Sequence, residues 1–226
     1  MPRVSYIKIE KGISSARLSS YRNLNQTRAR TLKKYGENIQ LCEALYPLMQ
    51  QLEIVLRNQF ELVLIKKYGQ DWFRDSKLLY LLDRQGRGDV FKAVEKLAAS
   101  KKSIYSGSVV AELMFGFWTS LFSKNYEVEF WRPYNNLLFP ATTPNNRNIQ
   151  KIRDDLTKIR QLRNRIAHHE PINKKPSELW SRYEDMIRLL EWMNPDVMRW
   201  LRSSRCDRFT SVFNKIYTPK VKKVKI

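Results

Sequence analysis

The chain has 226 residues, of which 42% are hydrophobic and 28% charged, a composition typical of globular rather than disordered proteins. Lys and Arg outnumber Asp and Glu by 42 to 22, so the net charge of +20 favours a polyanionic partner, nucleic acid before an acidic membrane surface. No apolar run approaches the roughly 18–20 residues of a membrane-spanning helix, and the first ten residues contain no apolar leader core. We therefore expect no membrane association and a cytoplasmic protein.

Cysteine and histidine usage narrows the possible chemistry. Cys42 and Cys206 lie far apart and form no CxxC pattern, which argues against a disulfide scaffold or a zinc module and fits a reducing compartment. The only two histidines are adjacent, His168 and His169, and two adjacent histidines without an acid cluster are a poor set of metal ligands. The sequence therefore predicts neither a metal nor a cofactor.

Basic residues gather at the two ends of the chain. Residues 1–34 carry nine basic side chains and one acid, and residues 202–226 carry eight and one. We predict one helical domain with a core over about residues 38–202 and basic flanks over 1–34 and 203–226. The flanks are expected either to contact RNA phosphates or to be solvated termini. The predicted RNA-binding residues are Arg3, Lys8, Lys11, Arg17, Arg22, Arg28, Arg30, Lys33, Lys34, Arg205, Arg208, Lys215, Lys220, Lys222 and Lys223.

The hydrophobic pattern indicates an all-α fold. Gly and Pro are sparse, and alternating strand-like runs are nearly absent. A helix over 38–68 is apolar on most faces and therefore central, with Pro47 at a kink or in a first turn. The other predicted elements are basic helical turns over 14–34, a helix over 71–82, a loop at 85–88, a helix from Asp89 to about 100, a helix over 109–122, an aromatic segment over 126–139 broken at Pro133 and Pro140, a helix over 147–168, a helix from Ser177 to 193, and a restart at Pro195.

The aromatic side chains outside the motifs are expected to pack in the core rather than to stack on bases. They are Phe115, Phe117, Trp118, Trp131, Tyr134, Trp180, Trp192 and Trp200.

The helix over 147–168 carries the residues that could perform chemistry. Its apolar positions form a stripe, and Arg163 falls near the middle of that stripe, while Asn164 and His168 are i, i+4 neighbours on its edge. A charged side chain within an apolar stripe is costly unless it is paired or used. Glu53, on the central apolar helix, is the best candidate partner. Glu53 also lies four residues before Arg57, so these two are either a structural pair or support for Arg163.

Arginine and histidine in this arrangement suit phosphoryl transfer within RNA. A 2′-hydroxyl attacks the adjacent phosphate, histidine moves a proton, and arginine stabilises the oxyanion charge. General acid and general base are two tasks, and a symmetric dimer would bring two such clusters together. The alternative is that His168 and His169 merely occupy a helix C-terminus, where the helix dipole favours cations.

Four segments resemble one known family. Leu162-Arg-Asn-Arg-Ile-Ala-His-His169 is similar to the Arg-x4-His signature of the HEPN superfamily, in its Arg-Asn form. The segments Leu52-Glu-x3-Arg-Asn58, Tyr68-Gly-x2-Trp72 and Ala111-Glu-Leu-Met-Phe-Gly-Phe-Trp118 are similar to blocks of the Abi-like (abortive infection) proteins within that superfamily. The resemblance covers about residues 40–172.

The resemblance implies that the all-α fold is an HEPN-like helical bundle with additional helices and basic flanks. It also implies a commonly dimeric, metal-independent endoribonuclease linked to phage defence or toxin behaviour. Arg163 and His168 would be catalytic, Asn164 would orient them, and a structured noncoding RNA could restrain the enzyme. The expected supporting residues are Glu53, Arg57, Asn58 and His169. A non-catalytic RNA-binding module is the main alternative, and a protein–protein module is a third.

Overall fold

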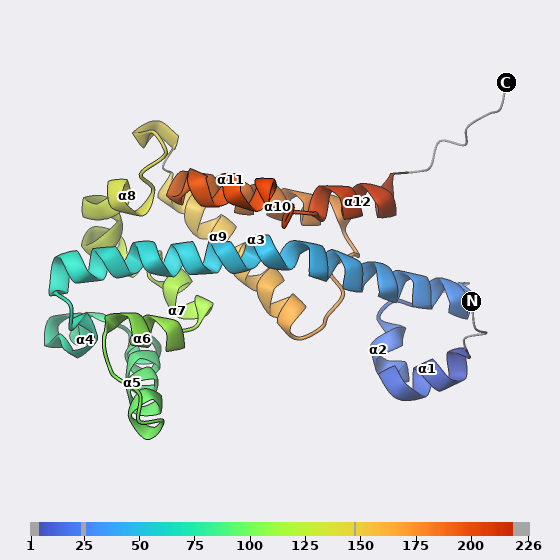
Figure 1. The fold of residues 1–226 in the computed structure, drawn as a ribbon, viewed down its shortest axis with the longest axis horizontal. Coiled ribbons are helices and arrows are strands. Elements are labelled where there is room, and N and C mark those ends of the chain that lie inside the picture. The colour runs from blue at the N-terminus through green and yellow to red at the C-terminus, as the bar shows by residue number, and fades with distance from the viewer. Residues whose placement is uncertain (1–4, 24–25, 147, 219–226) are drawn as a thin grey trace.

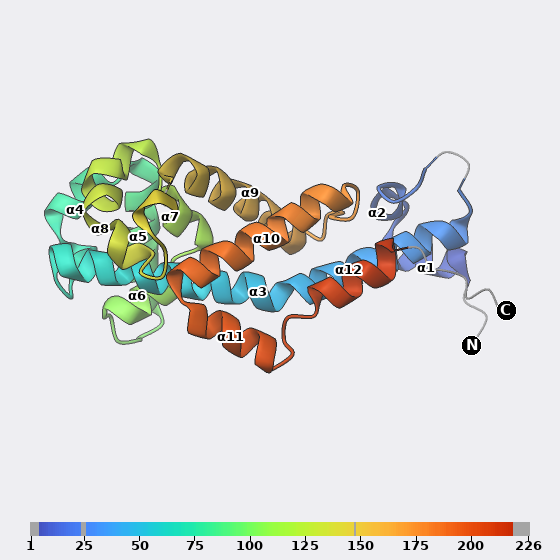
Figure 2. The ribbon, with the colours of Figure 1, turned by 90° about the horizontal axis from the view of Figure 1, so that it is seen from above.

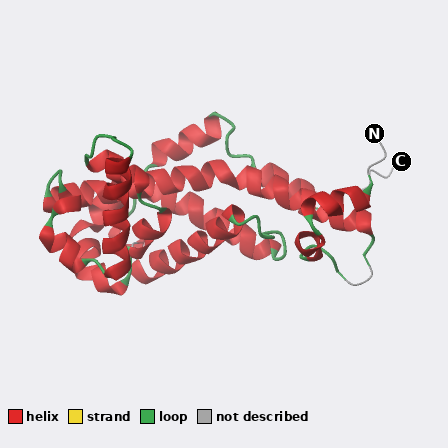
Figure 3. Cartoon of the chain, turned by 90° about the horizontal axis from the view of Figure 1, so that it is seen from below, coloured by secondary structure: helices red, strands yellow, loops and turns green. Residues whose placement is uncertain are grey.

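The computed structural model describes residues 5–23, 26–146 and 148–218, and within these ranges every regular element is a helix (Figure 3). This confirms the all-α prediction. One connected hydrophobic core joins most of the helices, from Leu41 in the first half of the chain to Phe209 near the end of the described residues. No helix among the described residues is long and apolar enough to cross a membrane.

A single long helix, α3 (Arg28–Tyr68), forms the axis of the molecule (Figure 1). Its 41 residues rise about 60 Å at about 1.5 Å per residue. The Thr27 hydroxyl caps it by accepting from the Arg30 N–H at 3.3 Å, so the helix begins well before the predicted residue 38. The basic segment 28–34 is therefore the first part of this axis rather than a separate flank.

Pro47 lies inside α3 and not in a first turn. A proline there removes one helical hydrogen bond and costs about 3 kcal/mol in an isolated helix. The side chains around it, Ala44, Leu45 and Leu48, are fully buried, so their burial outweighs that cost and keeps the helix continuous.

The other elements gather around this axis. Helices α1 and α2 lie beside the start of α3, the elements from α4 to α8 surround its other end, and α10, α11 and α12 pack along it (Figures 1 and 2). Their bounds are α1 (Tyr6–Ile13), α2 (Ser15–Ser19), η1 (Trp72–Arg74), α4 (Ser76–Leu81), α5 (Arg84–Ala99), α6 (Ser106–Glu112), α7 (Phe115–Ser120), η2 (Lys124–Tyr126), η3 (Glu127–Trp131), α8 (Arg132–Leu138), η4 (Pro144–Asn146), α9 (Ile149–Ala167), α10 (Pro176–Met193), α11 (Pro195–Ser203) and α12 (Phe209–Tyr217).

Three predictions in the middle of the chain are wrong. Residues 85–88 are helical and not a loop, because the Asp83 carboxylate accepts from the Gly86 N–H at 2.7 Å and caps α5 there rather than at Asp89. The predicted helix over 71–82 is divided by Asp75, whose carboxylate caps α4. The predicted helix over 109–122 is two helices, α6 and α7, because the backbone is extended at Leu113 and Met114.

The aromatic segment differs from its prediction at one proline. Pro133 lies in the first turn of α8, where a proline is tolerated, and does not break the segment, whereas α8 does end before Pro140.

The elements after Asn148 follow the predictions more closely. Helix α9 has nearly the predicted bounds, and Asn194 caps α11 by accepting from the Val197 N–H at 3.2 Å. Ser177 does not cap α10, which already begins at Pro176.

Two predictions near the C-terminus are wrong. The flank predicted from residue 203 contains α12, whose Phe209 is fully buried against the core. Trp200 is more than half exposed, so it is not a core residue. The predicted aromatic residues of α7 are in contrast all buried.

Candidate functional site

Arg163 and Glu53 form an ion pair between α9 and α3. The Nε atom of Arg163 lies 3.6 Å from Oε2 of Glu53, and 28% and 22% of the two side chains are exposed. This confirms the partner predicted for the arginine in the apolar stripe. Glu53 forms its ion pair with Arg163 and not with Arg57. Of the two predicted roles for Glu53, the structure therefore favours the support of Arg163 over a separate pair with Arg57.

Arg57 lies beside this ion pair in the same pocket. The pocket has a volume of about 270 Å³ and is lined by Tyr46, Met49, Gln50, Glu53, Ile54, Arg57 and Arg163. The buried Nε atom of Arg57 has no hydrogen-bond acceptor among the described residues. Two guanidinium groups and one carboxylate thus line one pocket, and the excess positive charge is suited to a phosphate oxygen.

A second, more apolar pocket adjoins the first one along α3. It has a volume of about 640 Å³ and is lined by Tyr21, Tyr35, Asn38, Ile39, Cys42, Glu43, Tyr46, Pro47, Ile166, Ala167, His169 and Arg208. Tyr46 lines both pockets, and the two pockets are together called the α3–α9 groove below. Burial raises the pKa of Cys42 to about 11 and that of Tyr21 to about 12. Both groups are therefore protonated at neutral pH, and Cys42 is not a thiolate nucleophile.

The other predicted site residues lie at or near the solvent. Asn164 and His168 are exposed, one helical turn apart, and the His168 N–H donates to the Asn164 carbonyl oxygen at 2.9 Å. Asn58 is exposed and lines neither pocket of the groove. The structure thus brings Arg163, Glu53 and Arg57 together, and places His168 and Asn164 at the end of the same helix.

The end of α9 is held in place from two sides. The Ile172 N–H donates to Oδ1 of the buried Asn38 in α3 at 2.7 Å. Nη1 of Arg17 in α2 donates to the carbonyl oxygens of His168 at 3.2 Å and His169 at 2.6 Å. Arg17 was predicted to bind RNA, but its guanidinium is engaged by the C-terminus of α9, where a cation is favoured.

Arg17→Ala is expected to lower the free energy of unfolding by about 1 kcal/mol, because it removes a charged donor from two helix-end carbonyls. Urea unfolding measures this difference. Arg22→Ala is the matched control, since Arg22 is exposed on the same segment and its side chain has no bonded partner among the described residues. Equal stabilities for the two variants would contradict a clamping role for Arg17.

His169 has a left-handed backbone conformation, with φ of 57°. Its N–H donates to the Ile166 carbonyl oxygen and the Glu170 N–H to that of Arg165, the Schellman pattern that usually has glycine at this position. Lys101, with φ of 54°, ends α5 in the same way. The conformation alone therefore does not indicate a functional residue, whereas the place of His169 in the groove lining distinguishes it from Lys101.

His169→Gly and Lys101→Gly are each expected to raise the free energy of unfolding by about 0.5–1 kcal/mol, because glycine adopts positive φ without strain. Thermal unfolding of the two variants in parallel measures this gain. A loss of stability in His169→Gly alone would mean that packing of the imidazole in the groove outweighs the backbone strain.

The predicted RNA-binding residues fall into three groups. Arg3, Lys220, Lys222 and Lys223 lie outside the described residues. Arg17, Arg28, Lys33 and Arg208 have partners: the α9 carbonyls, the Tyr6 ring at 5.2 Å, Glu37 at 3.7 Å and Glu43 at 2.8 Å respectively. The remaining side chains make no ion pair with a described residue, and all but the half-buried Lys34 are exposed: Lys8, Lys11, Arg22, Arg30, Lys34, Arg205 and Lys215.

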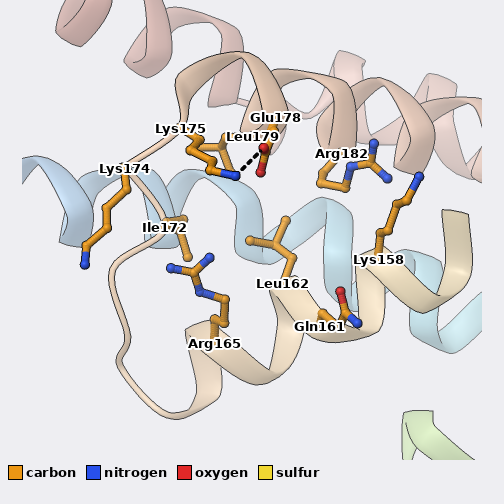
Figure 4. Close-up of a pocket in the computed structure, with 10 residues that line it drawn as sticks. All are labelled: Lys158, Gln161, Leu162, Arg165, Ile172, Lys174, Lys175, Glu178, Leu179 and Arg182. Carbon is orange, nitrogen blue, oxygen red and sulfur yellow. Dashed lines mark hydrogen bonds and ion pairs between the residues drawn. The ribbon is translucent and has the colours of Figure 1, made fainter.

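One strongly basic pocket was not predicted. It lies between α9 and α10 and includes Arg165, which is two residues from Arg163 and therefore on the opposite face of α9 (Figure 4). The spacing of Lys158, Leu162 and Arg165, together with the pair Lys174-Lys175, could have indicated it. Among the described residues, no group of three or more His, Cys, Asp or Glu side chains could hold a metal ion.

No protein-family model, no curated protein and no solved structure matches this chain. The resemblance to HEPN proteins therefore rests on the four segments quoted above.

Proposed function

We propose that this chain is a metal-independent endoribonuclease of the toxin or abortive-infection type. The observation that carries the proposal is the pocket in which Glu53 holds Arg163 beside Arg57, so that two guanidinium groups are balanced by one carboxylate. The helix that supplies Arg163 ends at the two histidines, so groups for charge stabilisation and for proton transfer come from one short segment.

The proposed reaction is transesterification within the RNA strand. The 2′-oxygen forms a bond to the adjacent phosphorus as its proton passes to a base, and the bond from phosphorus to the 5′-oxygen breaks as that oxygen takes a proton from an acid. His168 would carry a proton, and Arg163 with Arg57 would stabilise the charge on the phosphate oxygens. The products are a 2′,3′-cyclic phosphate and a 5′-hydroxyl.

RNA is the proposed partner, as substrate and as a structured noncoding RNA that restrains the enzyme. The exposed basic side chains of the two flanks support contacts to phosphates outside the groove. The restraint by a noncoding RNA and a cytoplasmic location follow from the resemblance and from composition, and both belong to the proposal.

Cleavage in EDTA tests the proposal directly. Protein stripped of bound RNA at high salt is expected to cut a labelled RNA with EDTA present and to leave fragments ending in 2′,3′-cyclic phosphate. Tight, salt-sensitive RNA binding without any cleavage would instead support the alternative, a non-catalytic RNA-binding module. One observation favours that alternative: His168 and Asn164 line neither pocket of the groove.

A homodimer completes the proposed mechanism. Ile39 and Tyr46 are seven residues apart on one face of α3, are 51% and 57% exposed, and line the groove next to Glu53. A second copy packed on this face would cover these apolar side chains and bring a second pair of histidines to the site.

Ile39→Lys is expected to convert the dimer to a monomer and to reduce cleavage, because it places an unpaired charge in the proposed interface. Leu62→Lys is the matched control, since Leu62 is 49% exposed on another face of the same helix. Light scattering after size-exclusion chromatography measures the mass. A wild-type protein that is monomeric and active at every concentration would refute the dimer.

A further inference from the structure

The pocket between α9 and α10 has a shape and a charge that the proposed cleavage does not use. Its volume is about 560 Å³, within the roughly 300–1,000 Å³ typical of small-molecule sites. Five basic side chains and one acid line it, together with one amide and three aliphatic side chains. The lining residues are Lys158, Gln161, Leu162, Arg165, Ile172, Lys174, Lys175, Glu178, Leu179 and Arg182.

The charged groups stand on either side of an apolar floor. Figure 4 shows Lys158 and Arg182 on one side of Leu162, and Arg165 and Lys174 on the other side. The buried side chains of Leu162, Ile172 and Leu179 form the floor between them. A ligand that fits this arrangement has a flat apolar part for the floor and negative charges for the two sides.

Three of the five basic groups are already held by the protein. Lys175 pairs with Glu178 at 2.6 Å, and Arg182 pairs with Asp185 at 3.0 Å. Arg165 donates to the Pro171 carbonyl oxygen and lies 3.7 Å from Glu170. These contacts fix the positions of the groups without neutralising the pocket.

Lys158 and Lys174 are exposed and make no ion pair with any described residue. They are therefore the two cations that are free to bind a ligand.

We propose that this pocket binds a nucleotide unit, with the base on the aliphatic floor and phosphate groups on the two free lysines, Lys158 on one side and Lys174 on the other. At the edge of a base, the Gln161 amide can donate and accept hydrogen bonds and the Glu178 carboxylate can accept them. The unit is either a free nucleotide, whose phosphates would lie on one of these two sides, or one residue of an RNA strand, whose two flanking phosphates would lie on both. The proposal goes beyond cleavage and requires neither Arg163 nor a histidine.

The test measures binding with probes that cannot be cleaved. The probes are ADP, UDP and a 2′-O-methyl decanucleotide, in which the attacking hydroxyl is blocked, so binding is separated from the proposed nuclease activity. The variant is Lys158→Ala/Lys174→Ala. Lys77→Ala/Lys92→Ala is the matched control, because these two lysines are exposed on α4 and α5, line no part of this pocket and make no ion pair with a described residue.

We expect the pocket variant to lose about tenfold or more in affinity, with the control unchanged. For the oligonucleotide, the slope of log affinity against log salt should fall by about 1.4, since each single-strand phosphate contact contributes about 0.7. If the diphosphates bind and the variant loses that binding, the pocket takes free nucleotides. If the diphosphates do not bind, and the pocket variant binds the oligonucleotide more weakly than the wild type does, the ligand is a residue of the strand.

Two results would overturn the proposal. One is an unchanged affinity and salt slope in the pocket variant. The other is displacement of the nucleotide by pyrophosphate or polyglutamate at an equal concentration of negative charge. That result would show that the pocket binds any anion and that the base contributes nothing to binding. Thermal unfolding of the variants confirms that the surface substitutions leave the fold intact.

Discussion

Arg163→Lys is expected to lower the rate of RNA cleavage by about 10²–10³-fold while the protein stays folded. Lysine keeps a positive charge next to Glu53 but loses the planar fork of donors that can contact two phosphate oxygens at once. Arg163→Ala would lower cleavage at least as much. It would also leave the mostly buried Glu53 carboxylate without its partner and so destabilise the fold.

Substitution of the neighbouring Arg57 is expected to affect the rate of cleavage without affecting stability. Because the buried Nε atom of Arg57 has no acceptor, Arg57→Ala is expected to leave stability unchanged or slightly raised while cleavage falls by about tenfold or more. This result would show that the Arg57 side chain is needed for the rate of cleavage and not for folding. A phosphate-binding role predicts this combination.

The measurement is single-turnover cleavage in EDTA at saturating RNA, with urea unfolding of each variant. Arg160→Lys is the control, since Arg160 lies on α9 one turn before Arg163 and lines neither pocket of the groove. Full activity in Arg163→Lys would remove the basis of the proposed mechanism. Equal losses in Arg160→Lys and Arg163→Lys would attribute the effect to the helix rather than to the pocket.

The position of Arg163 on α9 could be predicted from the sequence, because helical periodicity is a local property. The stripe from Ile152 to Leu162 fixed the face on which Arg163 lies, and the cost of leaving its charge unpaired identified Glu53 over a separation of 110 residues. The part of α3 before residue 38 was not predicted, because residues 28–37 carry few apolar side chains and the cap at Thr27 was not recognised.

Other features depend on contacts between distant segments, which no local pattern shows. Nothing in the local sequence distinguishes Arg17 from Arg22, yet of these two only Arg17 donates hydrogen bonds to the end of α9. The basic pocket combines α9, the following loop and α10, so it exists only after α10 packs beside α9. The predicted loop at 85–88 failed for a different reason: a nearer cap, Asp83, lies before the glycines.

His168→Ala is expected to lower single-turnover cleavage by about 10²–10⁴-fold, the usual contribution of one proton-transferring group, with little change in RNA affinity. His168 is favoured over His169 because it lies one helical turn after Asn164 and is exposed to an incoming strand. His169→Ala is expected to lower cleavage by no more than about tenfold, since its surroundings in the groove are largely apolar and aromatic.

Added imidazole distinguishes a proton carrier from a structural histidine. If His168 moves a proton, imidazole should restore part of the activity of His168→Ala and have no effect on Arg163→Lys. Loss of activity in His169→Ala and not in His168→Ala would transfer the role to His169. Full activity in the double variant would exclude both histidines as proton carriers and would require another group to move the proton, because an arginine keeps its proton in proteins.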